Sequence, residues 1–222
     1  MKVTLLDHMG SDLTVVNAAR VSFDKESDWV YCGGHSDGRD KDLSVKDKKL
    51  IKYLAEHNHW SPFSHCFVQF RVKAPIFVAR QLQKHQVGLA WNEVSRRYVD
   101  SDPEFYEPEV WRAKADNVKQ GSADDAVPFG EEAIKAIREC LDLADDTYSY
   151  MIGCGVCPEQ ARMVLPQSMY CEWVWSGSLY AFARVVNLRL DPHSQRETQE
   201  VAKQIAEFLH ALFPVSYNAL CN

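Results

Sequence analysis

The residues of this chain that can carry chemistry are most concentrated between Val78 and Tyr98, in the sequence VARQLQKHQVGLAWNEVSRRY. Cationic and hydroxyl side chains in this stretch suit a phosphate group, whereas amide and carboxylate side chains can pair with the amide edge of a heterocycle. An anionic nucleotide would use both kinds of group, and the alternative is a charged, solvated loop. The side chains concerned are Arg80, Gln81, Lys84, His85, Asn92, Glu93, Ser95, Arg96 and Arg97.

The sequence around this stretch predicts the elements that would position it. Residues from Cys66 to Lys73 alternate between apolar and polar, which predicts a strand. Ala74 to His85 has apolar residues at helical spacing, with Pro75 where a first helical turn accepts proline, and Gly88 then ends the pattern. A strand, a helix and a polar loop would therefore present the ligand groups from a rigid support. If Arg96 and Arg97 lie on an extended segment they point in opposite directions, and we favour Arg97 as the ligand contact.

The same stretch resembles the signature of the flavin-dependent thymidylate synthases, in which an Arg-His-Arg triplet is followed by Ser, Asn-Glu, Ser and Arg before a Tyr. The segment Asn92-Glu93-Val94-Ser95-Arg96-Arg97-Tyr98 matches the second half of that signature. The first half departs from it. Lys84-His85-Gln86 stands in place of Arg-His-Arg, the first Ser is absent, and Ala90-Trp91 implies one extra residue.

Two segments on the N-terminal side also resemble the family, and both concern its flavin. Ala18-Ala19-Arg20-Val21-Ser22 ends in a serine that lies close to the flavin in the family, although such residues also simply end helices. His59-Trp60-Ser61-Pro62-Phe63-Ser64-His65 is similar to His-x-Ser/Thr-Pro-Phe-Glu-His, whose first His and hydroxyl residue face the flavin. Ser64 replaces the usual Glu, which removes one polar group.

Two segments on the C-terminal side complete the resemblance. Ala161 to Pro166 is similar to Ala-Arg-x-x-Leu-Pro, and Arg162 would then contact the nucleotide, where an isolated arginine is otherwise a surface ion pair. Asn187 to Glu197 resembles Asn-Leu-Arg-x-x-x-His-x-Gln-x-Glu, where the alternative is a capped helix junction. Upstream, Ser178 and Tyr180 replace an Asn-x-Arg pair that contacts the flavin in the family.

The resemblance implies one α+β domain over residues 1–222, with a mixed or antiparallel sheet packed by helices, assembled as a homotetramer with sites at subunit interfaces. It implies reductive methylation of dUMP to dTMP, with methylenetetrahydrofolate as carbon donor and NADPH reducing bound FAD. Arg189 is the expected catalytic residue, because a fixed guanidinium can stabilise negative charge on the pyrimidine. The residues expected to bind dUMP are Gln81, Lys84, Glu93, Ser95, Arg96, Arg97, Arg162 and Arg189. Those expected to bind FAD are Ser22, His59, Ser61, Lys84, His85, Leu188 and His193.

Two alternatives stay open at this point. One is a related enzyme that uses the same site to make another 5-substituted pyrimidine nucleotide, such as a hydroxymethyl product, which the altered Lys84-His85-Gln86 triplet motivates. The other is a non-catalytic nucleotide-binding or assembly protein, which the replacements at Ser64, Ser178 and Tyr180 motivate.

Composition sets the broad class of the protein. The chain has 222 residues, of which 46% are hydrophobic, enough for a sizeable core without disulfides or metals. A net charge of -6 argues against a nucleic-acid polymer as partner, since polymer binding needs a basic face. Neither a signal peptide nor a membrane span is evident, so we expect a soluble, cytoplasmic protein.

Seven scattered cysteines predict free thiols, buried or partly buried, rather than a disulfide framework. Cys154 and Cys157 form a CxxC pair without a second pair, and His57, His59 and His65 are spread over a turn containing Pro62 with no nearby acidic pair to complete a site, so we expect no metal site.

The remaining elements follow from periodicity. A long helix with one apolar stripe, Phe129 to Met151, is expected in the core. We expect strands at Lys2–Leu6 and Ser168–Ser176. Further helices are expected at Asp12–Val21, from the Ser44 cap to Glu56, at Pro158–Leu165, at Leu179–Leu190 and at Ser194–Phe213. Asp24–Asp42 is expected to be a mobile excursion, and no regular structure is assigned to Asp100–Pro128.

Overall fold

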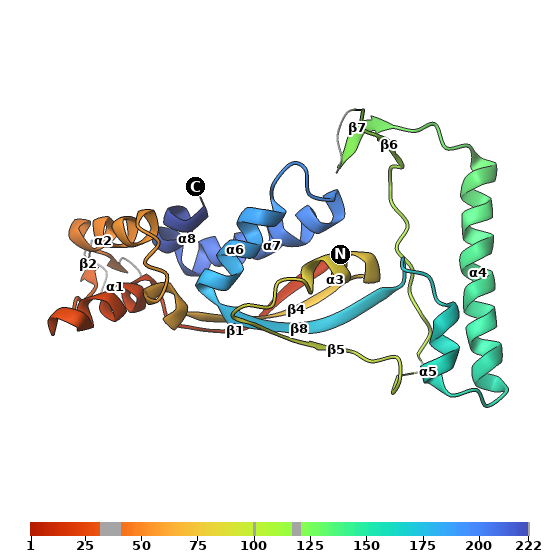
Figure 1. Ribbon diagram of the computed structural model, residues 1–222, viewed down its shortest axis with the longest axis horizontal. Helices are drawn as coiled ribbons and strands as arrows, with labels where there is room; N and C mark the ends of the chain where they lie inside the picture. Colours follow the sequence, from red (N-terminus) through yellow and green to blue (C-terminus); the bar gives the residue numbers. More distant parts are fainter. Residues whose placement is uncertain (32–40, 100, 117–120, 222) are drawn as a thin grey trace.

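A computed structural model describes residues 1–31, 41–99, 101–116 and 121–221 (Figure 1). Within these residues the main sheet is antiparallel and has four strands in the order β1-β4-β8-β5. Their bounds are Lys2–Met9 for β1, Phe67–Pro75 for β4, Tyr170–Ser178 for β8 and Leu89–Glu93 for β5. The expected α+β fold with an antiparallel sheet packed by helices is confirmed, and residues 32–40 of the expected excursion lie outside the described residues.

The two faces of the sheet differ because the central strands alternate in polarity. On β4, Val68, Phe70 and Val72 are buried, and on β8 the same face carries Trp173 and Trp175. Helices α3 (Ile76–Leu82), α6 (Leu179–Arg189) and α7 (Arg196–Leu212) lie on one side of the sheet in Figure 1. The other face is polar, with Arg71 paired to Glu172 and Gln69 donating to Ser176. An antiparallel sheet tolerates one solvated face.

Aromatic side chains fill the space between sheet and helices. The Phe182 ring on α6 meets the rings of Phe70 and Trp175 edge to face, each at a centroid distance of 5.1 Å. Trp91 stacks on Trp173 at 4.2 Å, which attaches the edge strand β5 to the core. Glycine is required at position 177, where β8 passes close to the start of β5, because a Cβ on Gly177 would lie 2.5 Å from the backbone oxygen of Gly88.

A second group of helices packs at one end of the sheet. It consists of α1 (Asp12–Arg20), α2 (Val45–Glu56) and α8 (Pro214–Cys221), of which α8 was not predicted. Ser44 caps α2 as expected, since its hydroxyl accepts from the Asp47 backbone N–H. The buried Asp12 carboxylate accepts from the Val215 and Ser216 N–H groups at 2.9 and 2.8 Å, which fixes the start of α8. Short connecting elements nearby are η1 (Val21–Phe23), β2 (Val30–Tyr31), β3 (Lys41–Asp42) and η2 (Pro62–His65).

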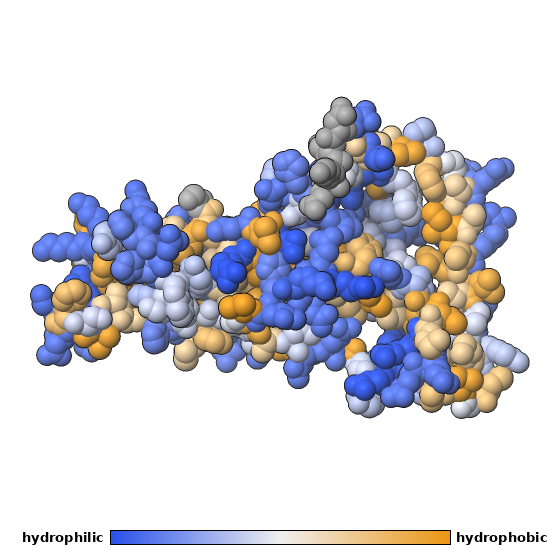
Figure 2. Space-filling view, in the orientation of Figure 1, coloured by the Kyte–Doolittle hydropathy of each residue, from blue (hydrophilic) through white to orange (hydrophobic). Residues whose placement is uncertain are grey.

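Residues 101–116 and 121–169 form an arm at the other end of the sheet. It contains the two-stranded pair β6 (Arg112–Lys114) and β7 (Ser122–Ala126), the long helix α4 (Glu131–Gly153), α5 (Pro158–Ala161) and η3 (Arg162–Val164). The expectation of a core helix is wrong for α4, which stands apart from the sheet in Figure 1. Of the α4 residues, all described, Tyr148 alone is buried. Leu143 is 66% exposed, and hydrophobic side chains gather along α4 in Figure 2.

The cysteines of the described residues differ in burial, with Cys221 half-buried between two extremes. Cys66 and Cys171 are buried, and burial raises the pKa of each thiol to about 12. Cys140, Cys154 and Cys157 are exposed, so the prediction of buried or partly buried thiols is wrong for these three. No helix in the described part of the chain is long and apolar enough to cross a membrane.

Candidate active site

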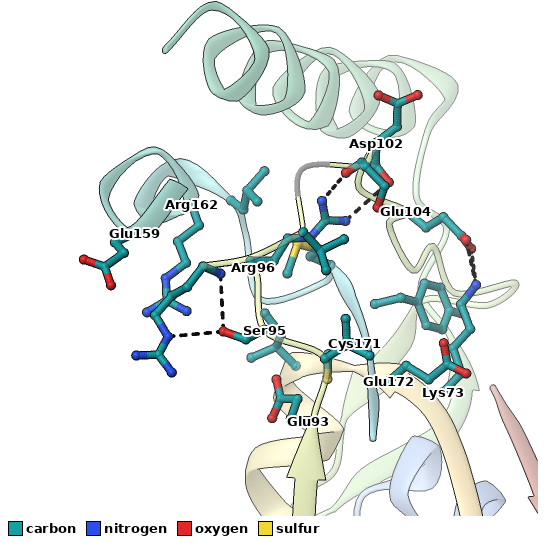
Figure 3. A pocket seen from close by; sticks show the side chains of 18 of the residues that line it. Lys73, Glu93, Ser95, Arg96, Asp102, Glu104, Glu159, Arg162, Cys171 and Glu172 are labelled. Carbon is teal, nitrogen blue, oxygen red and sulfur yellow. Dashed lines mark hydrogen bonds and ion pairs between the residues drawn. The ribbon is translucent and has the colours of Figure 1, made fainter. Parts of the chain in front are cut away.

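Four predicted nucleotide residues at the C-terminal end of the Val78–Tyr98 stretch line a cavity of about 770 Å³ between β5 and the arm, which we call the Ser95 cavity, whereas Gln81 and Lys84 of the same stretch do not (Figure 3). Figure 3 shows Arg162 entering from the short helical segment of the arm and Glu93 from the end of β5. The cavity therefore joins two parts of the chain. Five of the predicted dUMP residues line it, namely Glu93, Ser95, Arg96, Arg97 and Arg162.

A turn rather than an extended segment positions Arg96 and Arg97. The Tyr98 N–H donates to the Ser95 carbonyl at 2.9 Å, just beyond the end of β5. The Arg96 guanidinium donates to the backbone carbonyls of Ser101 and Asp102, and it stands 6.0 Å from the ring centre of Tyr148. Arg96 thus holds the segment to the arm and has fewer free donors for a ligand.

Arg97 and Arg162 are less restrained. The Arg97 side chain donates to the Ser95 hydroxyl at 3.3 Å and lies 5.0 Å from the ring centre of Tyr98. Arg162 is exposed and has no hydrogen-bond or ion-pair partner among the described residues. Two guanidinium groups are consequently available to an anion beside the Ser95 hydroxyl.

Arg189 lies in a different cavity of about 580 Å³, which we call the Arg189 cavity. It stands at the last position of α6, and its Nε donates to His85 Nε2 at 2.9 Å. Its Nη2 donates to the Gln81 carbonyl at 3.3 Å. The residues lining the cavity are Gln81, Arg112, Gly121, Ser122, Arg189, His193, Ser194 and Gln195.

The contact between Arg189 and His85 requires a neutral imidazole whose Nε2 accepts. Burial, together with the charges of Arg189 and Arg184, lowers the pKa of His85 to about 4. Partial burial also lowers the pKa of Arg189 from its ordinary value, although an arginine stays charged. His85 therefore acts as a fixed acceptor behind Arg189 at neutral pH.

Gln81 is held by α7. Its side-chain oxygen accepts from the Thr198 hydroxyl at 3.0 Å, and its nitrogen donates to the Gln195 side chain at 2.7 Å. Helices α3, α6 and α7 are thereby joined around Arg189 by hydrogen bonds, which limits the motion of the guanidinium.

Arg112 forms another wall of the Arg189 cavity, and no sequence motif pointed to it. Its Nη2 donates to Glu197 at 2.7 Å and its Nε to the Ser122 hydroxyl at 2.8 Å. Burial would raise the pKa of the Glu197 carboxyl, but the hydrogen bonds it accepts, the one from Arg112 first among them, together with the charge of Arg112 outweigh burial and hold the pKa below its ordinary value. Glu197 was noticed only as the last residue of the Asn187–Glu197 motif.

A third cavity of about 150 Å³, the Trp60 cavity, contains His59 and aromatic side chains. The Trp60 and Tyr180 rings lie 6.3 Å apart, and Arg184 and Asn187 line the same space. Aromatic faces beside a guanidinium and an amide fit a ligand with fused rings and phosphate groups, as a flavin dinucleotide has.

Ser178, the last residue of β8, and Tyr180, in the first turn of α6, are the two replacements of the flavin-contacting pair, and they do different things. The Ser178 hydroxyl is buried and accepts from the Ala181 N–H at 3.2 Å, so it caps α6. Tyr180 lines the Trp60 cavity.

The structure does not bring all predicted flavin residues together. His193 lines the Arg189 cavity with its side chain 71% exposed, paired to Asp191 at 3.0 Å. Five of the predicted flavin residues line none of the three cavities: Ser22, Ser61, Lys84 and Leu188 are exposed, and His85 is half-buried behind Arg189.

Comparison with known proteins shows the relationship. Residues 4–215 match the family described as thymidylate synthase complementing protein. The chain is 37% identical over 221 residues to the flavin-dependent thymidylate synthase of Kosmotoga olearia, covering 99% of this chain and 90% of that protein. It is 38% identical over 217 residues to the protein of the same name from Thermus thermophilus, covering 98% of this chain and 74% of that one.

A solved structure has the same fold. The UMP/dUMP methylase PolB from Streptomyces cacaoi, bound with 5-Br dUMP, superposes with a TM-score of 0.82 and 30% identity. The match covers 98% of this chain and 93% of the methylase. These similarities extend over nearly the whole chain, and the chain belongs to the thymidylate synthase complementing protein family, whose named relatives are flavin-dependent thymidylate synthases.

Proposed function

We propose that the protein converts dUMP to dTMP, taking a one-carbon unit from methylenetetrahydrofolate and using FAD that NADPH has reduced. Beyond family membership, the observation that carries this proposal is Arg189. Its guanidinium is partly buried and oriented by the neutral His85 and by the Gln81 carbonyl, in a cavity open to a ligand. A fixed cation of this kind stabilises negative charge that develops on the amide edge of uracil.

The two arginine-bearing cavities suggest a division of roles. In the Ser95 cavity, Arg97, Arg162 and the Ser95 hydroxyl would hold the phosphate of dUMP, with Arg96 and Glu93 beside them. In the Arg189 cavity, Gln81 and Arg189 would hold the base, with Lys84 nearby in the chain. The nucleotide would thus be gripped at its phosphate and polarised at its base.

The residues proposed for FAD are Ser22, His59, Ser61, Lys84, His85, Leu188 and His193. The Trp60 cavity supports this assignment, since it adds aromatic rings and the guanidinium of Arg184 next to His59. When bound, the flavin would supply the hydride that completes the methyl group. His85 and Arg189, in direct contact, would couple the flavin and pyrimidine halves of the site.

A site shared between copies of the chain accounts for the separate cavities. Arg97 and Arg189 line different cavities of one chain, so a complete site would take groups from more than one subunit. The arm also exposes apolar side chains, with Leu143 66% and Met163 78% exposed. We propose a homotetramer in which such surfaces are covered.

The test begins with the visible spectrum of the purified protein after FAD is added, followed by anaerobic reduction with NADPH, with and without dUMP. Flavin bands that bleach faster in the presence of dUMP would support one site for both ligands. A protein that takes up no flavin would refute the proposal and favour the non-catalytic alternative.

The mass of the product then separates the enzymatic alternatives. A methyl group at C5 supports the thymidylate reaction, whereas a hydroxymethyl product supports the related enzyme. UMP is tested beside dUMP, because the solved relative from Streptomyces cacaoi is described as a methylase of both.

A further inference from the structure

Contacts with other residues hold the Arg112 side chain in place. Arg112 belongs to the arm, whereas Arg189 belongs to helix α6. Its side chain is 17% exposed, and that of its partner Glu197 is 5% exposed. The Tyr106 hydroxyl lies 3.5 Å from the same Glu197 oxygen, and Ser122 accepts from Arg112 on the neighbouring strand. Contacts with β7 and α7 therefore fix the plane of the guanidinium.

These contacts occupy two of the three side-chain nitrogens of Arg112. Nε and Nη2 are used by Ser122 and Glu197, while Nη1 has no partner in the described ranges. Arg112 lines the Arg189 cavity, and the residues that line it include no carboxylate. Glu197, which balances the charge of Arg112, stands outside the lining.

We propose that Arg112 is a second ligand-binding cation of the Arg189 cavity, that it binds the oxygen-rich, negatively polarised edge of the pyrimidine together with Arg189, and that Glu197 is its positioning residue. This inference rests on the proposed function, because it assigns the base of the nucleotide to that cavity.

Physical reasons favour such a pair. Two guanidinium groups that share a cavity repel each other without an anion, so a ligand that carries negative charge between them gains from both. A carboxylate behind one of them lowers the cost of holding that arginine partly buried, without blocking its free nitrogen. The arginine fork also fixes direction, which a lysine does not.

The experiment compares dUMP with 5-fluoro-dUMP, whose N3–H is more acidic because fluorine withdraws electrons. Affinities for the FAD-loaded protein are measured by calorimetry between neutral and alkaline pH. In the wild type, the preference for 5-fluoro-dUMP is expected to grow as its N3 ionises. Arg112→Gln is expected to reduce that preference roughly tenfold, the effect of losing one charge-assisted hydrogen bond.

Three variants and one ligand control make the outcome specific. Arg112→Lys should keep part of the preference for the ionised ligand, and it also serves if Arg112→Gln fails to fold. Glu197→Gln, which leaves the cation in place, should weaken both ligands while keeping the preference. The double variant Arg112→Gln/Glu197→Gln should resemble Arg112→Gln. A pH-dependent change elsewhere in the protein affects both ligands alike, so the ratio to dUMP corrects for it.

Equal weakening of both ligands by Arg112→Gln and Glu197→Gln, with an unchanged preference, would show that the pair only ties the arm to α7 and would overturn the inference. A wild type that binds FAD but neither nucleotide would instead refute the proposed function. A wild type that makes dTMP, together with an unchanged preference in Arg112→Gln, would refute the Arg112 inference alone.

Discussion

In the Ser95 cavity the Arg97 side chain is held by one hydroxyl at 3.3 Å, whereas in the Arg189 cavity the guanidinium is held by an imidazole at 2.9 Å and a backbone carbonyl. The elements that carry the two arginines differ as well. Arg97 lies in a turn beyond an edge strand, whereas Arg189 ends a helix whose inner face is buried in the core.

This difference matches the work that each cavity would do. A phosphate is fully charged before and after the reaction, so the groups that bind it need only attract and hold it. Negative charge on the pyrimidine appears only during the reaction, and its stabilisation depends on a cation whose position is fixed in advance. A loosely held arginine suits the first task and a network-held arginine suits the second.

Arg189→Ala should have the largest effect. We expect turnover to fall by about 10²–10³-fold, as removal of one fixed charge-stabilising donor does. Folding should persist, because the side chain lines a cavity rather than the core. Turnover measured with saturating dUMP, alongside a thermal melt and an FAD titration, tests this expectation.

Arg189→Lys is the matched control, since it keeps the charge and loses the planar fork. It should recover only a small part of the turnover. Wild-type-like synthesis by Arg189→Ala would remove Arg189 from the proposed role.

Arg97→Ala should have the next largest effect, of a different kind. We expect the KM for dUMP to rise roughly tenfold or more with a smaller change in kcat, as for a lost contact made equally in ground and transition states. The matched control is Arg138→Ala, which removes an exposed arginine paired to Glu107 at 2.7 Å and lying outside all three cavities. An exposed pair of this type contributes little, so its kinetics should stay near wild type.

Mixing the Arg189→Ala and Arg97→Ala chains tests whether the two cavities meet across subunits. If one site takes Arg189 from one chain and Arg97 from another, random co-assembly restores about a quarter of the sites. Recovered turnover in co-expressed protein would support shared sites. Mixtures no more active than the average of the two variants would place both arginines of each site in the same chain.

The core was predictable from the sequence. Apolar and polar residues alternate along β4 and β8, and α7 has one apolar stripe, so these patterns indicate directly which side chains are buried. Periodicity failed for α4. Its stripe has the spacing of a core helix, but the sequence does not say whether the partner surface belongs to the same chain. Pro214–Cys221 was missed because its helix depends on Asp12, about 200 residues away in the chain.

The site residues were predicted mainly from the order of the family's motifs along the chain, and less from the expected helices and strands. Glu93 and Ser95 were found by resemblance, yet the sequence did not reveal that β5 would attach them to the core through Trp91 and Trp173. The contact between Arg112 and Glu197 could not be predicted, since the folding of the arm onto α7 is what brings the two residues together. A contact between residues so far apart in the chain leaves no recognisable spacing of residue types in the sequence.

The smallest predicted effect concerns the pH dependence of the network around Arg189. His85 has a pKa of about 4 in the folded protein, against an ordinary value of 6.5. Between these values the unfolded chain binds a proton that the folded chain does not. This group therefore makes the protein progressively less stable as pH falls from 6.5 to about 4, and adds no further dependence below that. Denaturation at a series of pH values should show this slope, and His85→Gln should lack it.

Arg184 allows the cause of the low His85 pKa to be tested separately from the burial of the imidazole. Because its positive charge lowers the pKa of His85, Arg184→Gln should raise that pKa while leaving the hydrogen bond from Arg189 in place. An NMR titration of the imidazole measures the shift directly. A wild-type His85 that titrates near its ordinary value of 6.5 would mean that the imidazole is neither buried nor close to the Arg189 and Arg184 guanidinium groups, as its contact with Arg189 requires. The contrast between a network-held and a loosely held arginine would then lose its main support.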